Sequence, residues 1–465
     1  RSHTKQGEQF FIIDAVTKEK NLAFDHQKLA AALSLTTKKE IKAQKFPFIS
    51  FDLINKKTIS VKIKDELYQC DIVRYSCQQS KNTVNNNELV APNGLYAVYI
   101  YDNNLWLRKL SDNSKKQLTT DGIENFAYAT NNAGWIRNDK PVVKWSPDSK
   151  KLTTFKHDGR NVGEMGIVST AVGHPKIDVW KYPLPGDKNI FQIHRVVIDV
   201  EQAKVTALDM PADDHRSTIT DHVAGRDGSL LDIDWSADSS HFLFVSSTRD
   251  HKTATLKVAD ATTGKVQTIL SETENTFFES GVSGISWQYL DKSNEIIWFS
   301  QRSDWGHLYL VDATTGKIKN QITQGNWTVL ELLDVNQDTG KLIFTAAGKE
   351  GGDPYFHYLY SINKDGSGLT LLTPEQKHHR ISLSKNAAYF LDRVSTPNQP
   401  ETSFIRSTSS KSGFVVEQMD ISKLSATGWQ APTPFIVKDR NNQHDIYGLM
   451  YKPSDFDASK SYPVV

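Results

Sequence analysis

The hexapeptide Asp-Ala-Thr-Thr-Gly-Lys occurs at residues 260–265 and again at residues 312–317, 52 positions further along the chain. Each copy lies between two short segments of apolar or alternating residues, and this pattern predicts two β-strands joined by a tight turn. Gly264 and Gly316 occupy the turn position that requires a positive φ angle, which glycine adopts without steric cost. The two copies therefore predict two β-hairpins that belong to a structural repeat.

A second marker has the same period. Trp235 and Trp287 also lie 52 residues apart, and each precedes an apolar segment of the length of one strand. Trp145 opens an earlier unit but precedes Trp235 by 90 residues, so we expect that unit to contain an insertion of roughly 40 residues. A period of about 50 residues with four short strands per unit is typical of β-propeller blades, which bury their faces against one another.

The repeats predict an all-β fold, an eight-bladed β-propeller with a truncated first blade. The expected units are residues 9–42, 46–78, 88–119, 140–209, 228–271, 282–323, 328–373 and 380–424. One helix is expected in the first unit, over residues 28–33, with Asp25 as its N-cap. We assign residues 1–428 to the propeller and residues 429–465 to the start of another domain, because the repeat ends near Trp429 and an isolated hairpin pattern follows.

The composition excludes several classes of partner. The chain has 55 Lys and Arg against 54 Asp and Glu, so no excess of positive charge favours nucleic acid or an anionic membrane. No apolar run is long enough to span a bilayer.

Two segments have part of a metal-binding motif. Residues 334–345 resemble the start of a calcium loop but lack its final glutamate, and His378-His379 lacks the spacing of a zinc helix. We therefore expect a turn and a solvated loop at these places, and neither a metal nor a cofactor.

The two cysteines of the chain, Cys70 and Cys77, are separated by six residues. This spacing allows a disulfide across a short hairpin, and such a bond persists in an oxidising compartment. The alternative is a pair of free thiols.

Several short motifs follow one another in an order that is known from one family. They are Asn104-Leu-Trp-Leu107, Gln117-Leu-Thr119, Trp145-Ser-Pro-Asp148, Tyr182-Pro-Leu-Pro-Gly-Asp187, Ser303-Asp-Trp-Gly-His-Leu-Tyr309, Thr323-Gln-Gly-Asn-Trp327 and Tyr447-Gly-Leu-Met-Tyr451. In these motifs the chain resembles the N-terminal propeller region of the dipeptidyl peptidase IV family of serine peptidases. The resemblance implies that residues 429–465 are the first strands of a truncated α/β-hydrolase domain.

The resemblance also implies a function. The propeller would gate and orient peptide substrates for a serine peptidase whose catalytic domain is absent from this chain. Its partners would be peptides, its own C-terminal hydrolase domain and, in the full-length protein, a second copy; its location would be the bacterial periplasm or the exterior. No Gly-x-Ser-x-Gly motif occurs, so we expect no catalytic residue in this chain and no activity of the fragment. The alternative is a stand-alone propeller that binds protein partners.

In the family that the chain resembles, two adjacent glutamates bind the free amino terminus of the substrate. The corresponding segment here, residues 123–139, has no adjacent acidic pair, since Glu124 and Asp139 lie 15 residues apart. We therefore expect the intact enzyme to discriminate weakly for a free amino terminus. The residues that could line the altered pocket are Tyr128, Asn131, Asn132 and Trp135. The alternative is an ordinary surface loop.

The insertion at residues 156–187 supplies two further candidates. Arg160 could bind a substrate carbonyl or carboxylate through its planar guanidinium group, and Glu164 lies close to it in sequence. The alternative for Arg160 is a surface ion pair with Asp158.

Overall fold

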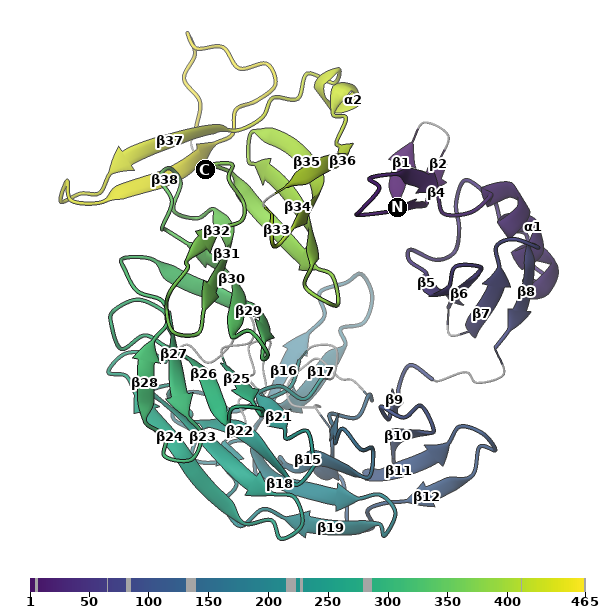
Figure 1. The fold of residues 1–465 in the computed structure, drawn as a ribbon, viewed down its shortest axis with the longest axis vertical. Helices are drawn as coiled ribbons and strands as arrows, with labels where there is room; N and C mark the ends of the chain where they lie inside the picture. Colours follow the sequence, from purple (N-terminus) through teal and green to yellow (C-terminus); the bar gives the residue numbers. More distant parts are fainter. Residues whose placement is uncertain are drawn as a thin grey trace. The chain divides into compact units, whose positions relative to one another are not determined.

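A computed structural model describes residues 1–4, 7–64, 66–80, 85–130, 139–214, 223–225, 229–278, 287–410 and 412–463 (Figure 1). The chain divides into two compact units. The first comprises Arg1–Phe10, Phe24–Arg302 and Leu310–Lys319, and the second Phe11–Ala23, Ser303–Tyr309 and Asn320–Val465. No helix among the described residues is long and apolar enough to cross a membrane.

Most of the described chain forms antiparallel sheets whose strands follow one another in sequence order. Four of these sheets precede residue 280: β5 (Asp52–Asn55), β6 (Thr58–Ile63), β7 (Glu66–Asp71) and β8 (Ser76–Gln79); β9 (Leu89–Val90), β10 (Tyr96–Tyr101), β11 (Asn104–Lys109) and β12 (Lys115–Gln117); β13 (Phe126–Tyr128), β14 (Lys144–Trp145), β15 (Lys151–Asp158), β18 (Gln192–Asp199), β19 (Lys204–Ala207) and β20 (Asp213–Asp214); and β21 (Ile233–Trp235), β22 (His241–Ser247), β23 (Thr253–Asp260) and β24 (Val266–Thr273).

Three further four-stranded sheets follow: β25 (Trp287–Leu290), β26 (Glu295–Ser300), β27 (His307–Asp312) and β28 (Ile318–Gln321); β29 (Thr328–Asn336), β30 (Lys341–Ala347), β31 (His357–Asn363) and β32 (Thr370–Leu371); and β33 (His378–Leu383), β34 (Tyr389–Thr396), β35 (Gln399–Ser407) and β36 (Gly413–Gln418). This succession of sheets, each built from a continuous stretch of chain, is that of propeller blades.

The remaining elements are small. They are the two-stranded pairs β1 (Ser2–Thr4) with β2 (Gly7–Gln9), β3 (Phe11–Ile13) with β4 (Lys20–Leu22), β16 (Glu164–Val168) with β17 (Ile177–Lys181) and β37 (Thr433–Lys438) with β38 (Asp445–Met450), and the helices α1 (His26–Thr37) and α2 (Ser422–Ser425). The described residues thus contain seven sheets of four or more strands, and the predicted count of eight blades is not confirmed.

The difference lies in the first predicted unit, residues 9–42. Its strands β3 and β4 have three residues each and, among the described strands, pair with one another alone; helix α1 takes up much of the rest. Asp25 caps α1 as predicted, because its carboxylate accepts a hydrogen bond from the Lys28 backbone N–H at 3.0 Å. The helix extends past residue 33 to Thr37, where the Ser34 and Thr36 hydroxyls donate to carbonyls one turn earlier.

The hexapeptides form the two predicted hairpin turns. Asp260 accepts hydrogen bonds from the Thr262 and Thr263 backbone N–H groups, and the Gly264 N–H donates back to the Asp260 carbonyl at 3.0 Å. Asp312 repeats the arrangement, and Gly264 and Gly316 have φ angles of 75° and 66°. These backbone hydrogen bonds lower the pKa of both aspartates. The expected turns, including their positive-φ glycines, are confirmed.

Adjacent sheets pack face to face through their apolar residues. One cluster joins residues of the β13–β20 sheet with residues of the β21–β24 sheet, and Phe155, Trp235 and Phe244 are buried in it. The tryptophans that mark the repeat, Trp145, Trp235 and Trp287, are all at least nine-tenths buried. The periodic tryptophans therefore belong to the packing between blades.

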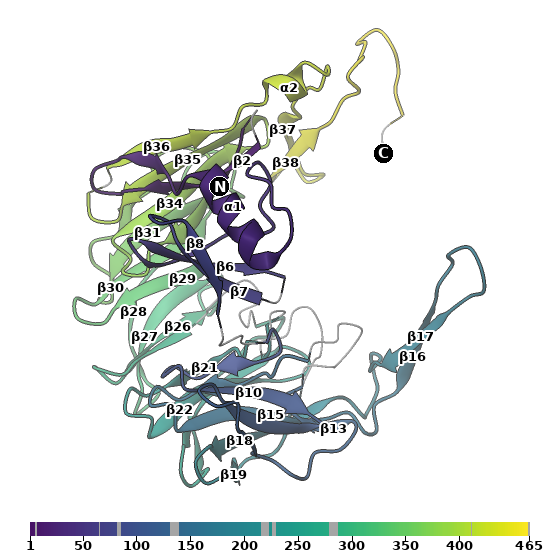
Figure 2. The ribbon, with the colours of Figure 1, turned by 90° about the vertical axis from the view of Figure 1, so that its right-hand side faces the viewer.

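The predicted insertion forms a hairpin of its own. Within the described part of the chain β16 and β17 pair with each other alone, and they run out from the end of β15 (Figure 2). The base of the hairpin is fixed within the first unit, where Arg249 donates hydrogen bonds to the backbone carbonyls of Leu184 and Asp187. The insertion thereby places β16 and β17 beside the ends of β13 and β15.

A cluster of aromatic rings surrounds His26 at the start of α1. The Phe10 backbone N–H donates to His26 Nε2 at 2.9 Å, so the imidazole must be neutral to accept this bond. Burial lowers the pKa of His26 from 6.5. The folded state therefore binds the proton less readily than the unfolded chain. The stabilisation of the folded state by the neutral His26 imidazole is complete above pH 6.5 and is lost as the pH falls below that value.

We expect His26→Gln to make the free energy of unfolding less dependent on pH between about 7 and 5, because glutamine still accepts from Phe10 but does not titrate. Denaturant unfolding at several pH values measures this slope. His174→Gln, at an exposed histidine, is the control and should retain the wild-type slope. Equal slopes in wild type and His26→Gln would contradict the prediction.

Candidate functional site

A cavity of about 430 Å³ lies in the first unit, where the ends of β13 and β15 meet the base of the β16–β17 hairpin. Its walls are formed by Ile100, Asn103, Glu124, Asn125, Ala127, Thr130, Asp139, His157, Gly159, Glu164, Val179, Trp180, Lys181 and Phe191. The volume is in the range of small-ligand and peptide side-chain pockets, about 300–1,000 Å³.

Three carboxylates from separate segments line this cavity. Glu124 lies in the tight turn before β13, Asp139 precedes β14, and Glu164 is the first residue of β16. The pairing of β13 with β15, Phe126 opposite Asp158, brings the turn next to the hairpin. In the described part of the chain none of the three has an ion-pair partner, so their negative charge is available to a ligand.

Among the described residues that line the cavity, Lys181 carries a positive charge. It stands opposite Glu164 in the β16–β17 register, but its ammonium group donates to the Val162 carbonyl at 3.1 Å. Its charge is thus held by backbone at the base of the hairpin. In the described part of the lining, three carboxylates face this one ammonium group, and the excess of negative charge favours a cationic ligand.

Two buried polar atoms also belong to residues of this wall. Thr130 is only 8% exposed, and neither its hydroxyl oxygen nor the indole nitrogen of Trp180 has a hydrogen-bond partner among the described residues. Buried polar atoms are normally paired, so these two are candidates for contacts with a bound ligand. His157 stacks on Phe191, with ring centroids 5.0 Å apart, and gives the cavity an aromatic wall.

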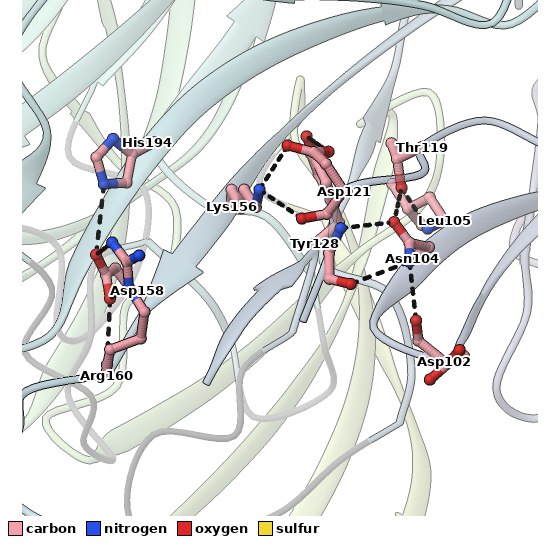
Figure 3. A network of polar contacts seen from close by, with 11 residues as sticks. Asp102, Asn104, Leu105, Thr119, Asp121, Tyr128, Lys156, Asp158, Arg160 and His194 are labelled. Atoms are coloured by element: carbon pink, nitrogen blue, oxygen red, sulfur yellow. Dashed lines mark hydrogen bonds and ion pairs between the residues drawn. The ribbon is translucent and has the colours of Figure 1, made fainter. Parts of the chain in front are cut away.

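Next to the cavity, the Asp121 carboxylate contacts Tyr128 of β13 and Lys156 of β15 (Figure 3). It accepts a hydrogen bond from the Tyr128 hydroxyl at 2.7 Å and pairs with the Lys156 ammonium at 2.7 Å. The bond from Lys156 lowers the pKa of Asp121, whereas burial and the bond to Asp121 raise the pKa of Tyr128. Tyr128 is therefore a buried residue with its hydroxyl engaged, and it is not part of the cavity wall.

Arg160 is also engaged by neighbours (Figure 3). Its guanidinium group donates two hydrogen bonds to the Asp158 carboxylate, at 3.0 and 2.7 Å, and lies 4.0 Å from the centre of the Phe126 ring. The Arg160 bond lowers the pKa of Asp158. The structure thus shows the ion pair that was the alternative for Arg160, and Arg160 does not line the cavity.

The other predicted residues fall into two groups. Glu164 lines the cavity, whereas Asn131, Asn132 and Trp135 lie outside the described residues. Thr130, Trp180 and Lys181 also line the cavity, although no motif in the sequence indicates them. Recognition of the insertion as a hairpin would have indicated Lys181, because the register places it opposite Glu164.

Cys70 and Cys77 are joined by a disulfide bond. They face each other in the pairing of β7 with β8, and their Cα atoms are 4.1 Å apart. The bond lies in the β5–β8 sheet and does not contribute to the cavity.

One group of side chains in the second unit has the composition of a metal site. Glu375, His379 and Asp392 place their ligand atoms within 4.8 Å of one another. However, the Arg406 guanidinium group donates to Asp392 at 2.8 Å and to Glu375 at 2.6 Å, and thus supplies the positive charge. His378 and His379 begin strand β33, and His379 is fully buried, so the expectation of a solvated loop was wrong; the strand pairing with β34 buries it.

Comparisons with known proteins show which family this chain belongs to. Residues 45–401 match the family described as the dipeptidyl peptidase IV N-terminal region. The "Probable dipeptidyl-aminopeptidase B" of Emericella nidulans is 24% identical over 409 residues, covering 81% of this chain and 43% of that protein. The Aspergillus oryzae protein of the same name is 24% identical over 410 residues, with the same coverage.

Solved structures share the fold. The dipeptidyl peptidase 4 of Porphyromonas gingivalis matches with a TM-score of 0.69 at 17% identity, covering 99% of this chain and 64% of that chain. A structure from Bacteroides ovatus matches with a TM-score of 0.70 at 20% identity, covering 98% and 64%. This chain thus spans less than half of the two fungal relatives and about two thirds of the two solved chains. With the matched residues 45–401, these findings show that the chain belongs to the dipeptidyl peptidase IV N-terminal region family, with an all-β propeller arrangement.

Proposed function

We propose that this chain is the propeller of a serine peptidase and that it orients peptide substrates by holding their free amino terminus in the cavity of Glu124, Asp139 and Glu164. The observation that carries the proposal is the convergence of these three carboxylates, without ion-pair partners among the described residues, on one cavity of about 430 Å³. Family membership and the peptidase names of the matched relatives support the reaction class.

The chemistry of the cavity suits an ammonium group. A primary ammonium has three N–H donors and one positive charge, and charge-assisted hydrogen bonds to carboxylates are roughly twice as strong as neutral ones. Trp180 can donate to a peptide carbonyl, which would fix the first residue of the substrate beyond its amino group. The expectation of weak discrimination for a free amino terminus, drawn from the spacing of Glu124 and Asp139 along the sequence, stays the alternative to this proposal.

The proposal extends to the domains of the full-length protein. Residues 1–428 would be the propeller, and residues 429–465, with the β37–β38 hairpin, would begin the α/β-hydrolase domain that carries out the chemistry. Both strands of this hairpin expose apolar side chains, among them Ile436, Val437 and Ile446. The full-length enzyme would be secreted or periplasmic and would form homodimers. The relatives' names do not favour the alternative, a stand-alone propeller that binds proteins.

Binding to the chain itself tests the proposal without catalysis. We expect a dipeptide amide with a free amino terminus to bind at least tenfold more tightly than its N-acetylated form, which has neither the charge nor two of the donors. Isothermal titration calorimetry at pH 7 measures both affinities, and a dipeptide with an N-terminal hydroxyl is a neutral control. Equal affinities for the free and acetylated peptides would exclude the cavity as an amino-terminus site.

A further inference from the structure

The second unit has a larger cavity, of about 590 Å³. Its walls come from the loop between β30 and β31, the start of β33, the turn between β34 and β35, and β38 (Figure 1). The lining residues are Asp353, Tyr355, Phe356, His378, Ser395, Thr396, Pro397, Tyr447, Gly448 and Leu449. None of them lines the cavity of Glu124, Asp139 and Glu164, called the carboxylate cavity below, so the two cavities are separate.

The loop before β31 presents one carboxylate together with two aromatic rings. Gly348 and Gly352 have φ angles of 83° and 98°, which lets the loop turn sharply ahead of Asp353. The Asp353 carboxylate accepts the Tyr355 backbone N–H at 2.9 Å, and its carbonyl accepts the Phe356 N–H at 3.1 Å. These bonds fix Tyr355 and Phe356 beside the carboxylate, and Tyr355 is 70% exposed although it belongs to an ordered loop.

The described residues that line the cavity include a single carboxylate, that of Asp353. Asp353 has no ion-pair partner in the part of the chain that the structure describes. His378, another lining residue, is neutral near pH 7, because burial and the neighbouring His357, His379 and Arg380 lower its pKa to about 4, although Asp353 acts to raise it. Its Nδ1 accepts the His357 backbone N–H at 3.4 Å. The remaining walls are aromatic, aliphatic or hydroxyl-bearing.

We propose that this cavity binds a small organic cation, an ammonium or guanidinium group on a short apolar skeleton, with Asp353 as its counterion and Tyr355, Phe356 and Tyr447 as its aromatic walls. Cations are attracted to the faces of aromatic rings, by about 0.5–1 kcal/mol at exposed sites and more when water is excluded. The cavity volume is sufficient for a molecule of this kind. This site is independent of the proposed amino-terminus site.

Calorimetric titration of the chain with phenethylamine and with the uncharged 2-phenylethanol tests the proposal. We expect the amine to bind at least tenfold more tightly than the alcohol. Asp353→Asn retains an acceptor for the Tyr355 N–H and removes only the charge, so it should weaken amine binding at least tenfold and leave the alcohol unaffected. Tyr355→Leu, at an exposed position, should weaken amine binding about threefold while retaining apolar contact.

Glu201→Gln, at an exposed carboxylate outside both cavities, is the matched control and should not change amine binding, whereas Glu164→Gln reports whether the amine also enters the cavity of Glu124, Asp139 and Glu164. If Glu164→Gln weakens the amine and Asp353→Asn does not, the amine occupies the other cavity and the proposal is wrong. Equal binding of the amine and the alcohol, or no heat from the amine at millimolar concentration, would also overturn it. Far-UV circular dichroism of each variant confirms that the sheets are retained.

Discussion

Replacing Gly316 with alanine is expected to lower the free energy of unfolding by about 2–5 kcal/mol. Gly316 has a φ of +66°, where an L-residue costs about 1–2 kcal/mol. A Cβ at this position would overlap the backbone carbonyl oxygen of Ile269, in β24 of the preceding sheet. A backbone carbonyl within a strand cannot rotate away, so the sheets must shift apart, and overpacking of this kind costs about 1–3 kcal/mol more.

Gly94 provides a matched control for this experiment. Its φ of +69° is nearly that of Gly316, but an added Cβ would meet no atom within 4 Å. Gly94→Ala should therefore lose only the backbone part, about 1–2 kcal/mol. Urea denaturation of both variants measures the difference, and equal losses would mean that the approach to Ile269 does not restrict residue 316.

The same close approach recurs at the other copy of the hexapeptide. A Cβ on Gly264 would overlap the carbonyl oxygen of Ala207, at the end of β19, and the Asp209 N–H donates to the Gly264 carbonyl at 2.8 Å. Each hexapeptide turn thus contacts the edge strand of the preceding sheet, β19 or β24. The repeated sequence specifies contact between blades as well as the turn, which explains why it could be read as a sign of a propeller.

Features that depend on local chemistry could be predicted from the sequence. The hexapeptide turns and the Asp25 cap need only backbone groups a few residues away. The insertion was found from the interval between Trp145 and Trp235, since its hairpin replaces no strand of the sheet. The predicted blade at residues 9–42 is not confirmed, because nothing in short apolar runs such as residues 11–13 and 20–22 indicates whether further strands will pair with them.

The residues of the candidate site could be predicted only in part from the sequence. Glu124 and Asp139 seemed too far apart in sequence to act together, and only the pairing of β13 with β15 places the turn of Glu124 near Glu164. Tyr128 and Arg160 were reasonable candidates by residue type, but each has a partner, Asp121 or Asp158, that holds its polar group. Spacing along the chain does not report such long-range pairings, and residue type does not show whether a polar group is already engaged.

If the proposed function is right, the combined substitution of Glu124, Asp139 and Glu164 by their amides is expected to remove a preference of the full-length protein for peptides with a free amino terminus. Loss of a charge-assisted contact costs about 2–5 kcal/mol, and a hundredfold change in kcat/KM corresponds to about 2.7 kcal/mol. We therefore expect kcat/KM for a free-amine peptide to fall at least a hundredfold. The value for the N-acetylated peptide of the same sequence should change little, because it never made the contact.

The ratio of the two kcat/KM values separates loss of recognition from damage to the enzyme. A folding defect would lower both values together, whereas loss of the amino-terminus contact lowers only that for the free amine. Single variants show which carboxylate contributes most, and Glu164→Gln should have a clear effect because Glu164 is held in the ladder opposite Lys181. Glu201→Gln, at an exposed carboxylate outside the cavity, is the matched control. A triple variant that keeps the wild-type ratio would show that other residues hold the amino terminus, and the cavity would then need another ligand.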